Sequence, residues 1–300
     1  MVPDELSEEV WFPLAHILAQ DSPFAQALRE VHHRLRAQDI RGGSKALKAA
    51  VRHAPNTPEA YTAIGWMWFL LGQLREARKA LQRALDMDTS YAPAHHLLGR
   101  ICSVLRLFDQ AEAHLKQAVA LSPHVPLYRA DLGTFYFNIG KLDEATHELK
   151  AAIALAEDDA QSHALLGFIA FLRGQPASAR EHFRLACRYE PENAHHYNNL
   201  GYIHLVLGDV GAAREAFAQA VRLRPRFIRA LYNRALVHWL EGETDTAAEM
   251  YARARELDGD GQEFQEHLAD IGELLEEGRL PTPYRQRLQQ LRERLAALSK

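Results

Sequence analysis

Apolar side chains recur along the chain with the spacing of an α-helix, and the whole pattern begins again every 34 residues. The stretch 194–227 shows two such stripes: Tyr197, Leu200, Gly201 and His204, then Ala213, Phe217 and Ala220. Gly208 lies between the stripes, where a turn is expected, and Pro225 ends the stretch. Each unit is therefore predicted to be two helices joined by a tight turn.

Seven copies of this unit fit without a gap between residues 24 and 261. They begin at Phe24, Pro58, Ala92, Pro126, Ala160, Ala194 and Ile228. The twenty-seventh position is alanine in every unit: Ala50, Ala84, Ala118, Ala152, Ala186, Ala220 and Ala254. Agreement at one position could be chance, but the other positions repeat as well, so the chain is predicted to be a repeat array.

Small residues at the eighth position predict close contact between the two helices of a unit. This position holds Gly65, Gly99, Gly133, Gly167 and Gly201, with Val31 and Ala235 in the outermost units. We expect it to face the alanine at the twentieth position of the same unit. A glycine inside a helix costs about 1 kcal/mol relative to alanine, so packing must provide the compensating gain. Bulk is expected at the seventh and twenty-fourth positions, and Gly72, Gly140, Gly174, Gly208 and Gly242 are expected in the turns.

These columns closely resemble the tetratricopeptide repeat family over about four fifths of the chain. The resemblance implies an all-α, right-handed α-solenoid of about seven helix-turn-helix repeats with helical caps at both ends. The first repeat is degenerate, with Glu30 and Arg34 at apolar positions and Gly43 in place of the usual alanine. Because the family is a scaffold that serves many partners, the resemblance says little about function.

The two ends of the chain do not follow the repeat. Residues 1–23 are expected to form an N-terminal helical cap, in which Trp11, Phe12, Leu14, Ile17 and Leu18 cover the open end of the array. Residues 262–300 are expected to form capping helices, the first acidic and the last basic, which pack together through their opposite charges. A dimerising role for the last helix is the alternative.

Composition excludes several classes of function. The net charge of −4 gives no general attraction to nucleic acid, so nucleic acid is an unlikely partner. We find no signal-peptide pattern and no apolar run long enough for a membrane helix, so we expect a cytoplasmic protein without membrane contact. Cys102 and Cys187 lack a CxxC spacing and are expected to be buried apolar residues. No motif of an enzyme active site is found, and no catalytic residue or cofactor is predicted.

The histidines do not predict a metal site. His204 and His238 share the eleventh position of adjacent repeats, and other pairs recur at the fourth and twenty-third positions. Each is a slot in which the repeat buries a ring of medium size. A zinc site needs further converging donors, which the spacing does not supply.

A binding surface is expected on the first helix of each repeat, on the side that lines the concave groove in the resembled family. The residues there are unusually apolar for a surface that faces solvent. The candidate groove residues are Trp66, Phe69, Arg100, Phe137, Asn138, Phe168, Phe171, Asn199, Tyr202, Asn233 and Trp239. Such a strip is either a partner site or is covered by the protein's own chain. Asn199 and Asn233 share the sixth position of adjacent repeats and resemble a short asparagine ladder.

Arg222, Arg224, Arg226 and Arg229 form a basic cluster between the sixth and seventh repeats. This cluster could contact an acidic partner, but we favour neutralisation by the acidic segment that includes Glu263 and Glu266. The heat-shock chaperone tail is a disfavoured ligand, because the lysines of the carboxylate-clamp arrays in the resembled family are missing here.

The sequence therefore supports a non-catalytic adaptor that holds a peptide or helix of another protein in an aromatic-lined groove. One alternative is a structural assembly subunit, a homo-oligomer with a self-occluded groove. A minor alternative is a regulatory subunit of an enzyme or nucleic-acid complex.

Overall fold

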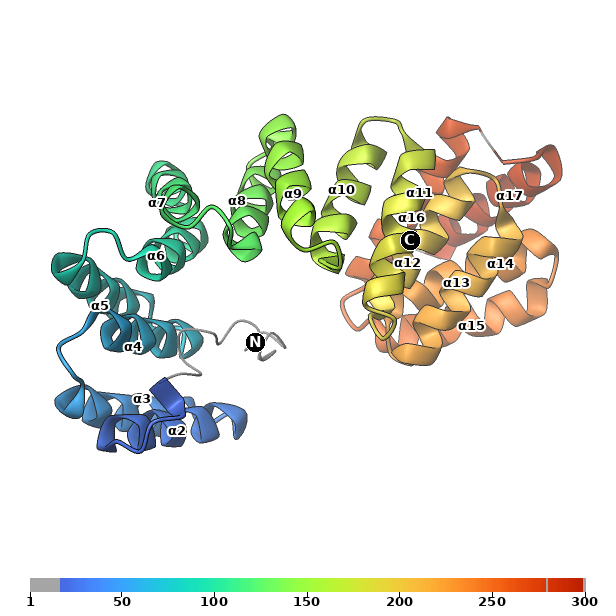
Figure 1. Cartoon of the computed structure of the whole chain (residues 1–300). Helices are drawn as coiled ribbons and strands as arrows, with labels where there is room; N and C mark the ends of the chain where they lie inside the picture. Colours follow the sequence, from blue (N-terminus) through green and yellow to red (C-terminus); the bar gives the residue numbers. More distant parts are fainter. Residues whose placement is uncertain (1–16, 279, 299–300) are drawn as a thin grey trace. The chain divides into compact units, whose positions relative to one another are not determined.

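The computed structural model describes residues 17–278 and 280–298, and within these ranges the chain is all helical apart from its turns. The predicted all-α repeat fold is confirmed (Figure 1). The first helices of the repeats are α2 (Pro23–Arg36), α4 (Pro58–Leu70), α6 (Ala92–Val104), α8 (Pro126–Asn138), α10 (Ala160–Leu172), α12 (Ala194–Val206) and α14 (Ile228–Glu241). The second helices are α3 (Ile40–Ala50), α5 (Leu74–Met87), α7 (Phe108–Leu121), α9 (Leu142–Leu155), α11 (Pro176–Tyr189), α13 (Val210–Leu223) and α15 (Thr244–Leu257).

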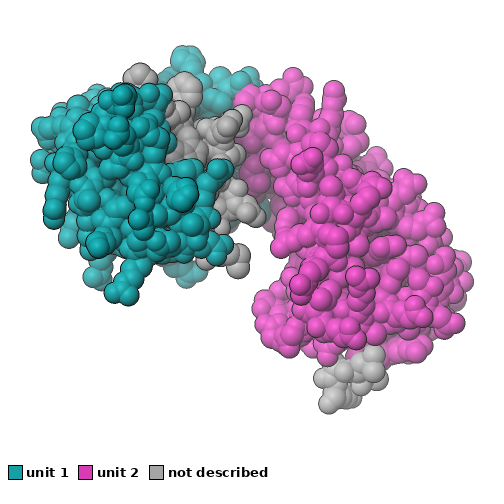
Figure 2. All heavy atoms as spheres, turned by 90° about the horizontal axis from the view of Figure 1, so that it is seen from below, with its two compact units in different colours: residues 1–155 teal, residues 156–300 magenta. Residues whose placement is uncertain are grey.

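The chain divides into two compact units, residues 1–155 and 156–300 (Figure 2). Unit 1 holds the pairs from α2/α3 to α8/α9, with a short 3-10 turn, η2 (Val51–His53), after α3. Unit 2 holds the pairs from α10/α11 to α14/α15, followed by α16 (Gln262–Glu277) and α17 (Thr282–Leu298). Within each unit, the two helices of a repeat make the most extensive contacts.

Local sequence signals explain where several first helices begin. The Ser22 hydroxyl accepts a hydrogen bond from the Ala25 amide at 3.1 Å, directly before a proline at the first helical position of α2. Thr57 caps α4 in the same way. The Asp159 carboxylate accepts from the Ser162 amide at the start of α10. Each cap satisfies a backbone donor that the helix itself leaves without an acceptor.

The glycines of the first helices meet a different neighbour from the one expected. A Cβ added to Gly99 would lie 2.6 Å from Leu115 Cγ, and one added to Gly201 would lie 2.7 Å from a ring carbon of Phe217. These neighbours occupy the twenty-fourth position of the repeat. The glycine therefore packs against the large side chain at that position, and its nearest neighbour is not the alanine at the twentieth position. The buried ring or isobutyl group lies directly on the glycine backbone, which explains the absence of a side chain there.

The turn between the helices needs a left-handed residue at the fifteenth position. Glycine takes it in most repeats, as at Gly140 with φ 78°. Gln38 and Arg106 occupy the same position in the first and third repeats with φ 57° and 59°. Side chains other than glycine are strained there, by roughly 1–2 kcal/mol.

The chain continues beyond the seventh pair with a helix that behaves like a further first helix. α16 begins where an eighth unit would start and packs against α14 and α12. α17 packs against both α16 and α14. The expected contact between the two C-terminal helices is confirmed, and apolar side chains form it: Leu288 and Leu291 are buried in one cluster with Ile271 and Leu274.

At the N-terminal end, Ile17 is buried in the same cluster as Phe24 and Leu28. Leu18 packs against that cluster. These two residues support the expected cover of the first repeat, whereas Trp11, Phe12 and Leu14 lie outside the described residues.

We predict that Gly99→Ala destabilises the protein. Overpacking costs about 1–3 kcal/mol, which exceeds the gain of about 1 kcal/mol in helix propensity. Urea unfolding followed by circular dichroism should show a lower midpoint. Gly259→Ala is the matched control, because a Cβ there has no atom within 4 Å in the described chain, and its midpoint should not fall. An unchanged midpoint for Gly99→Ala would contradict the packing argument.

A reciprocal exchange tests the turn. Arg106→Gly removes the left-handed strain and should raise the free energy of unfolding. The gain should be less than about 1 kcal/mol, because glycine also increases the conformational freedom of the unfolded chain. Gly140→Arg introduces the strain and should lower stability by about 1 kcal/mol. Thermal unfolding of both variants measures the two effects, and a fall in stability for Arg106→Gly contradicts the assignment.

Candidate functional site: the first-helix faces

Arg100 links three successive first helices of unit 1. Its guanidinium lies over the ring of Trp66, 5.4 Å from the centroid, and over the ring of Phe69 at 5.7 Å, both on α4. The two rings stack on each other with centroids 5.4 Å apart. On the other side, Arg100 Nε lies 3.6 Å from Asp131 Oδ2 on α8. These four side chains thus form one aromatic and charged row across α4, α6 and α8.

Asp131 is held in its charged form by a second partner. His96 Nε2 lies 2.5 Å from Asp131 Oδ2, and the imidazole packs on the Tyr128 ring with centroids 4.6 Å apart. Burial raises the pKa of Asp131, but the hydrogen bond from His96 and the charges of His96 and Arg100 outweigh it, so the pKa lies below its ordinary value. The carboxylate therefore remains ionised at neutral pH and fixes the Arg100 guanidinium over the rings.

The predicted groove residues of unit 1 differ in exposure. Trp66 is buried, whereas Phe69, Arg100 and Phe137 are half-buried. Asn138, the last residue of α8, is exposed. This first-helix face therefore offers parts of two phenyl rings, one guanidinium and one amide to a ligand.

In unit 2, three aromatic residues of the prediction lie on neighbouring first helices. Phe168 on α10 is 37% exposed and packs edge-on against Phe183, with centroids 5.0 Å apart. Phe171 meets the Tyr202 ring of α12 edge-on at 5.8 Å. The Tyr202 hydroxyl donates a hydrogen bond to Glu273 of α16 at 3.2 Å. The structure thus brings Phe171 and Tyr202 of adjacent repeats together.

The asparagine pairing differs from the expected ladder. Asn233 Nδ2 donates to Asn198 Oδ1 at 3.0 Å, and both side chains are buried. Asn199, which shares a repeat position with Asn233, directly follows Asn198 in the sequence and is half-buried. Adjacent first helices are offset, so the sixth position of one repeat meets the fifth position of the preceding repeat. The Asn198–Asn233 bond holds α12 and α14 together.

The C-terminal helix covers Trp239. The indole Nε1 donates to the backbone oxygen of Arg287 at 2.9 Å, and Arg294 lies over the ring at 5.4 Å. Arg287 Nη1 donates in turn to the backbone oxygen of Leu240 at 2.6 Å. Only 7% of Trp239 is exposed. Here the strip is covered by the protein's own chain, which was the alternative to a partner site.

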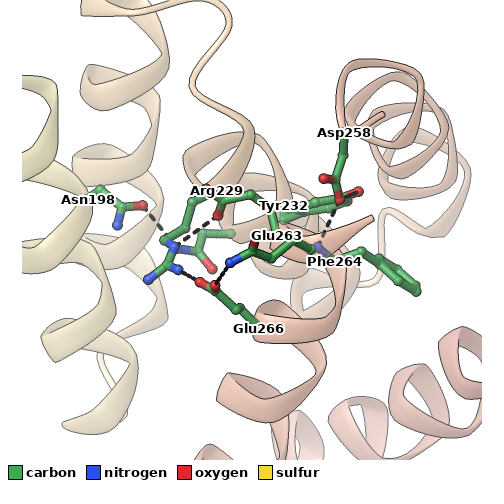
Figure 3. Close-up of polar contacts among 9 residues, drawn as sticks. Asn198, Arg229, Tyr232, Asp258, Glu263, Phe264 and Glu266 are labelled. Carbon is green, nitrogen blue, oxygen red and sulfur yellow. Dashed lines mark hydrogen bonds and ion pairs between the residues drawn. The ribbon is translucent and has the colours of Figure 1, made fainter. Parts of the chain in front are cut away.

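The four arginines of the predicted cluster lie in different environments. Arg229 forms ion pairs with Glu263 at 3.1 Å and with Glu266, both on α16 (Figure 3). This is the internal neutralisation that the acidic segment predicted. Arg224 lies over the Phe227 ring and bonds with His195 at 3.0 Å. Arg222 and Arg226 are exposed.

A buried polar network anchors α16 to the last repeat. Asp258 Oδ2 accepts hydrogen bonds from the Tyr232 hydroxyl at 3.0 Å and from the Phe264 amide at 2.9 Å (Figure 3). His267 packs flat on the Tyr232 ring and lies 2.9 Å from the Tyr251 hydroxyl. Burial lowers the pKa of His267 to about 3, so the imidazole is neutral at physiological pH.

Two pairs of histidines lie at the fourth and twenty-third positions of their repeats, where the sequence predicted packed rings. His95 Nδ1 lies 3.0 Å from His114 Nδ1, and His163 Nδ1 lies 3.4 Å from His182 Nδ1, at equivalent positions of two repeats. In each pair, the first histidine also bonds through Nε2 to a backbone carbonyl oxygen. These contacts join the two helices of one repeat.

One group of metal-type donors occurs in the described chain. Donor atoms of His238, Glu241 and Glu243 lie within 4.8 Å of one another. His238 Nδ1 is already bonded to Glu243 at 2.6 Å, and Arg214 lies 3.6 Å from Glu241. The group therefore consists of ion pairs at the end of α14. Both cysteines are buried, as predicted, and burial raises the pKa of the Cys187 thiol to about 12.

Comparison with known proteins identifies the repeat. Two family models match the chain, and both are described as tetratricopeptide repeat. The first matches residues 28–92, 170–226 and 198–262, and the second matches residues 106–167. The chain belongs to the tetratricopeptide repeat family. No curated protein matches the sequence. Among the helices of the described chain, none is long and apolar enough to cross a membrane.

Solved tetratricopeptide structures share this fold at low sequence identity. PilF of Pseudomonas aeruginosa superposes with a TM-score of 0.64 and 21% identity, over 71% of this chain and 97% of its own. The type IV pilus biogenesis factor PilW gives a TM-score of 0.63 and 17% identity, over 70% of this chain and 98% of its own. MamA gives 0.51 and 24% identity, over 57% of this chain and 93% of its own. These similarities establish the fold.

Sequence reasoning missed Asp131, His96 and Tyr128. Asp131 occupies the sixth position, where the other repeats after the first have an apolar residue or an asparagine. A lone carboxylate in such a column requires a cationic or hydrogen-bonding partner nearby. That requirement was the available signal, and His96 and Arg100 of the preceding repeat meet it.

The low pKa of His267 predicts a pH dependence of stability. The unfolded imidazole binds a proton near pH 6.5, and the folded one binds it only near pH 3. Between these two pKa values the unfolded state therefore binds more protons than the folded state. The free energy of unfolding falls as the pH decreases, by up to about 1.4 kcal/mol per pH unit. His267→Phe should flatten the slope of unfolding free energy between pH 6 and about pH 4.5. Tyr251→Phe removes the same hydrogen bond but keeps the imidazole, so its slope should equal that of the wild type.

Proposed function

We propose that this protein is a non-catalytic scaffold that binds a segment of another protein along its first-helix faces. The observation that carries the proposal is the near absence of charge on several first helices whose outward side chains remain partly exposed. α10 contains no charged residue, and α4 contains only Glu59. The second helix α5, of similar length, carries six charged residues. A helix that is apolar on all sides requires cover on both faces.

The proposed contacts are the residues of each face that the described chain leaves partly exposed. In unit 1 they are Phe69, Arg100, Phe137 and Asn138; in unit 2 they are Phe168, Phe171, Asn199 and Tyr202. Aromatic and arginine side chains dominate this set, and such residues contribute most often to binding energy at protein interfaces. Trp66, Trp239 and Asn233 are left out because they are buried.

A second candidate function is that of a structural assembly subunit. The cover of Trp239 by α17 and the bond from Tyr202 to α16 favour it for the C-terminal repeats. In that case, the first-helix face of unit 2 is partly filled by the protein itself, and copies of the chain associate through another surface. The minor alternative, regulation of an enzyme or nucleic-acid complex, would use the exposed Arg222 and Arg226.

The deciding experiment compares partner binding of two variants with matched exposure. Partners captured from native lysate are identified by mass spectrometry, and the affinity of the purified partner is then measured by calorimetry. Phe168→Ala/Phe171→Ala should weaken binding at least tenfold, in line with the loss of one or two interface anchors. Phe108→Ala is the control, because Phe108 is 44% exposed but begins the second helix α7. Its affinity should remain within about twofold of the wild type.

Equal loss in both variants, or none in either, contradicts binding at the first-helix face. Circular dichroism must first show that the variants are as helical and as stable as the wild type. Light scattering over a range of concentrations tests the alternative directly. If the chain captures only itself and its mass rises with concentration, the assembly subunit is the correct function.

A further inference from the structure

The second helices of unit 1 carry a row of cations that the proposed function does not use. α3 has basic residues at Arg41, Lys45 and Lys48 and no acidic residue. On α5, Arg75, Arg78 and Lys79 follow with helical spacing on one side. The side chains of Ser44 and Gln73 join the two helices, since Gln73 Nε2 donates to Ser44 Oγ at 2.6 Å.

Each row of cations lines a groove. A groove of about 390 Å³ lies between α5, α6 and α7, with Arg75, Arg78, Lys79 and Gln82 on one side and Leu98 and His114 on the other. A second groove, of about 500 Å³, is lined by Arg41, Ser44, Lys45 and Lys48 of α3 and by Asp39. Asp39 does not neutralise this groove alone, because it already binds Arg34 at 3.0 Å and caps α3.

Among the described residues, the cations of the first groove have no carboxylate partner, unlike several other cations of unit 1. Arg78 Nη2 reaches the uncharged Gln110 Oε1 at 3.5 Å. Within residues 17–278 and 280–298, no carboxylate lies within ion-pair distance of Arg75, Arg78 or Lys79.

By contrast, Lys116 and Lys141 share Glu112 at 2.6 and 2.9 Å. Their hydrogen bonds hold the pKa of Glu112 at about 2. Arg129 likewise pairs with Glu148 at 2.9 Å. Several cations on other helices of the unit thus have carboxylate partners, whereas this row has none among the described residues.

We propose that the second-helix face of unit 1, formed by α3 and α5 with α7, binds an acidic polypeptide segment of a partner protein. Carboxylates at every third or fourth residue of a helix, or at alternate residues of an extended segment, match the cation spacing on α5. The grooves give side chains a place to enter, and Leu98 offers them an apolar contact. Amides of Gln82 and Gln110 are able to bond a peptide backbone.

This inference is independent of the proposed function. Its cations lie on second helices, with Leu98 of α6 in the groove wall, whereas the scaffold proposal uses the outward faces of the first helices, and the two proposals share no residue. The net charge of −4 for the whole chain does not oppose it, because attraction at short range depends on the local charges within about a Debye length.

The experiment measures binding of a fluorescent peptide of twelve alternating Glu and Ala residues by anisotropy. The reference peptide has Gln in place of Glu. The wild type should bind the acidic peptide and not the reference peptide. Arg75→Gln/Arg78→Gln/Lys79→Gln should weaken binding roughly tenfold or more, the sum expected for the loss of three charge contacts near the surface. Arg41→Gln/Lys45→Gln/Lys48→Gln tests the second groove in the same way.

A matched variant, Lys150→Gln/Arg180→Gln/Arg253→Gln, removes three exposed cations outside these grooves and should keep wild-type affinity. Because Arg78 is half-buried, Arg75→Gln/Lys79→Gln keeps it and should still weaken binding severalfold with an unchanged unfolding midpoint. Equal loss in the matched variant, or equal binding of the Gln peptide, overturns the proposal.

Two competitors distinguish the source of the negative charge. Inorganic phosphate, compared with chloride at equal ionic strength, displaces the peptide at low millimolar concentration only if the groove is a small-anion site. A single-stranded oligonucleotide that binds more tightly than the peptide, and loses affinity in the triple variant, identifies nucleic acid as the ligand. Either result replaces the acidic polypeptide, and the failure of both competitors supports it.

Discussion

The close approach of the two helices within a repeat is the constraint on which the rest of the structure depends. A leucine or phenylalanine of the second helix lies directly on the backbone of the first, at the glycine that precedes it by sixteen positions. In the five central repeats, this contact fixes the distance and the rotation of the pair, because a side chain at the glycine leaves no room for the partner. With the pairs fixed, neighbouring first helices lie side by side and present the same positions. The row from Trp66 through Arg100 to Asp131 exists because of that alignment.

Much of the fold could be predicted because each structural requirement returns in every repeat. A glycine that recurs at one position of the repeat, or an alanine such as Ala152 at another, indicates that packing requires a small side chain there. A single occurrence would not indicate this. The lateral neighbours were harder to predict. The period of one helix says which residues share a face, but the offset between adjacent helices decides that Asn233 meets Asn198 and not Asn199. The cover of Trp239 depends on how the non-repeating α17 docks, and no periodic signal encodes that contact.

Charge is distributed differently over the two kinds of helix. First helices place their few charges in networks, as Asp131 does between His96 and Arg100, and Arg229 does with two glutamates of α16. Buried or half-buried charges require such partners, since the desolvation cost is otherwise unmet. Second helices such as α3 and α5 lie closer to solvent and tolerate rows of cations without partners. An overall charge near neutrality thus conceals one face that is apolar and another that is locally positive.

The position of Trp239 gives the protein an internal optical reporter. It is the only tryptophan among residues 156–300, and the other three all lie in the first 68 residues. Its ring is enclosed by α14 and α17, with a cation above it and a backbone carbonyl oxygen at its indole nitrogen. Release of α17 would transfer this ring from an apolar setting to water, with a shift of its fluorescence to longer wavelength. In a variant with the other tryptophans replaced by phenylalanine, emission would follow the docking of the last helix in real time, without an attached dye.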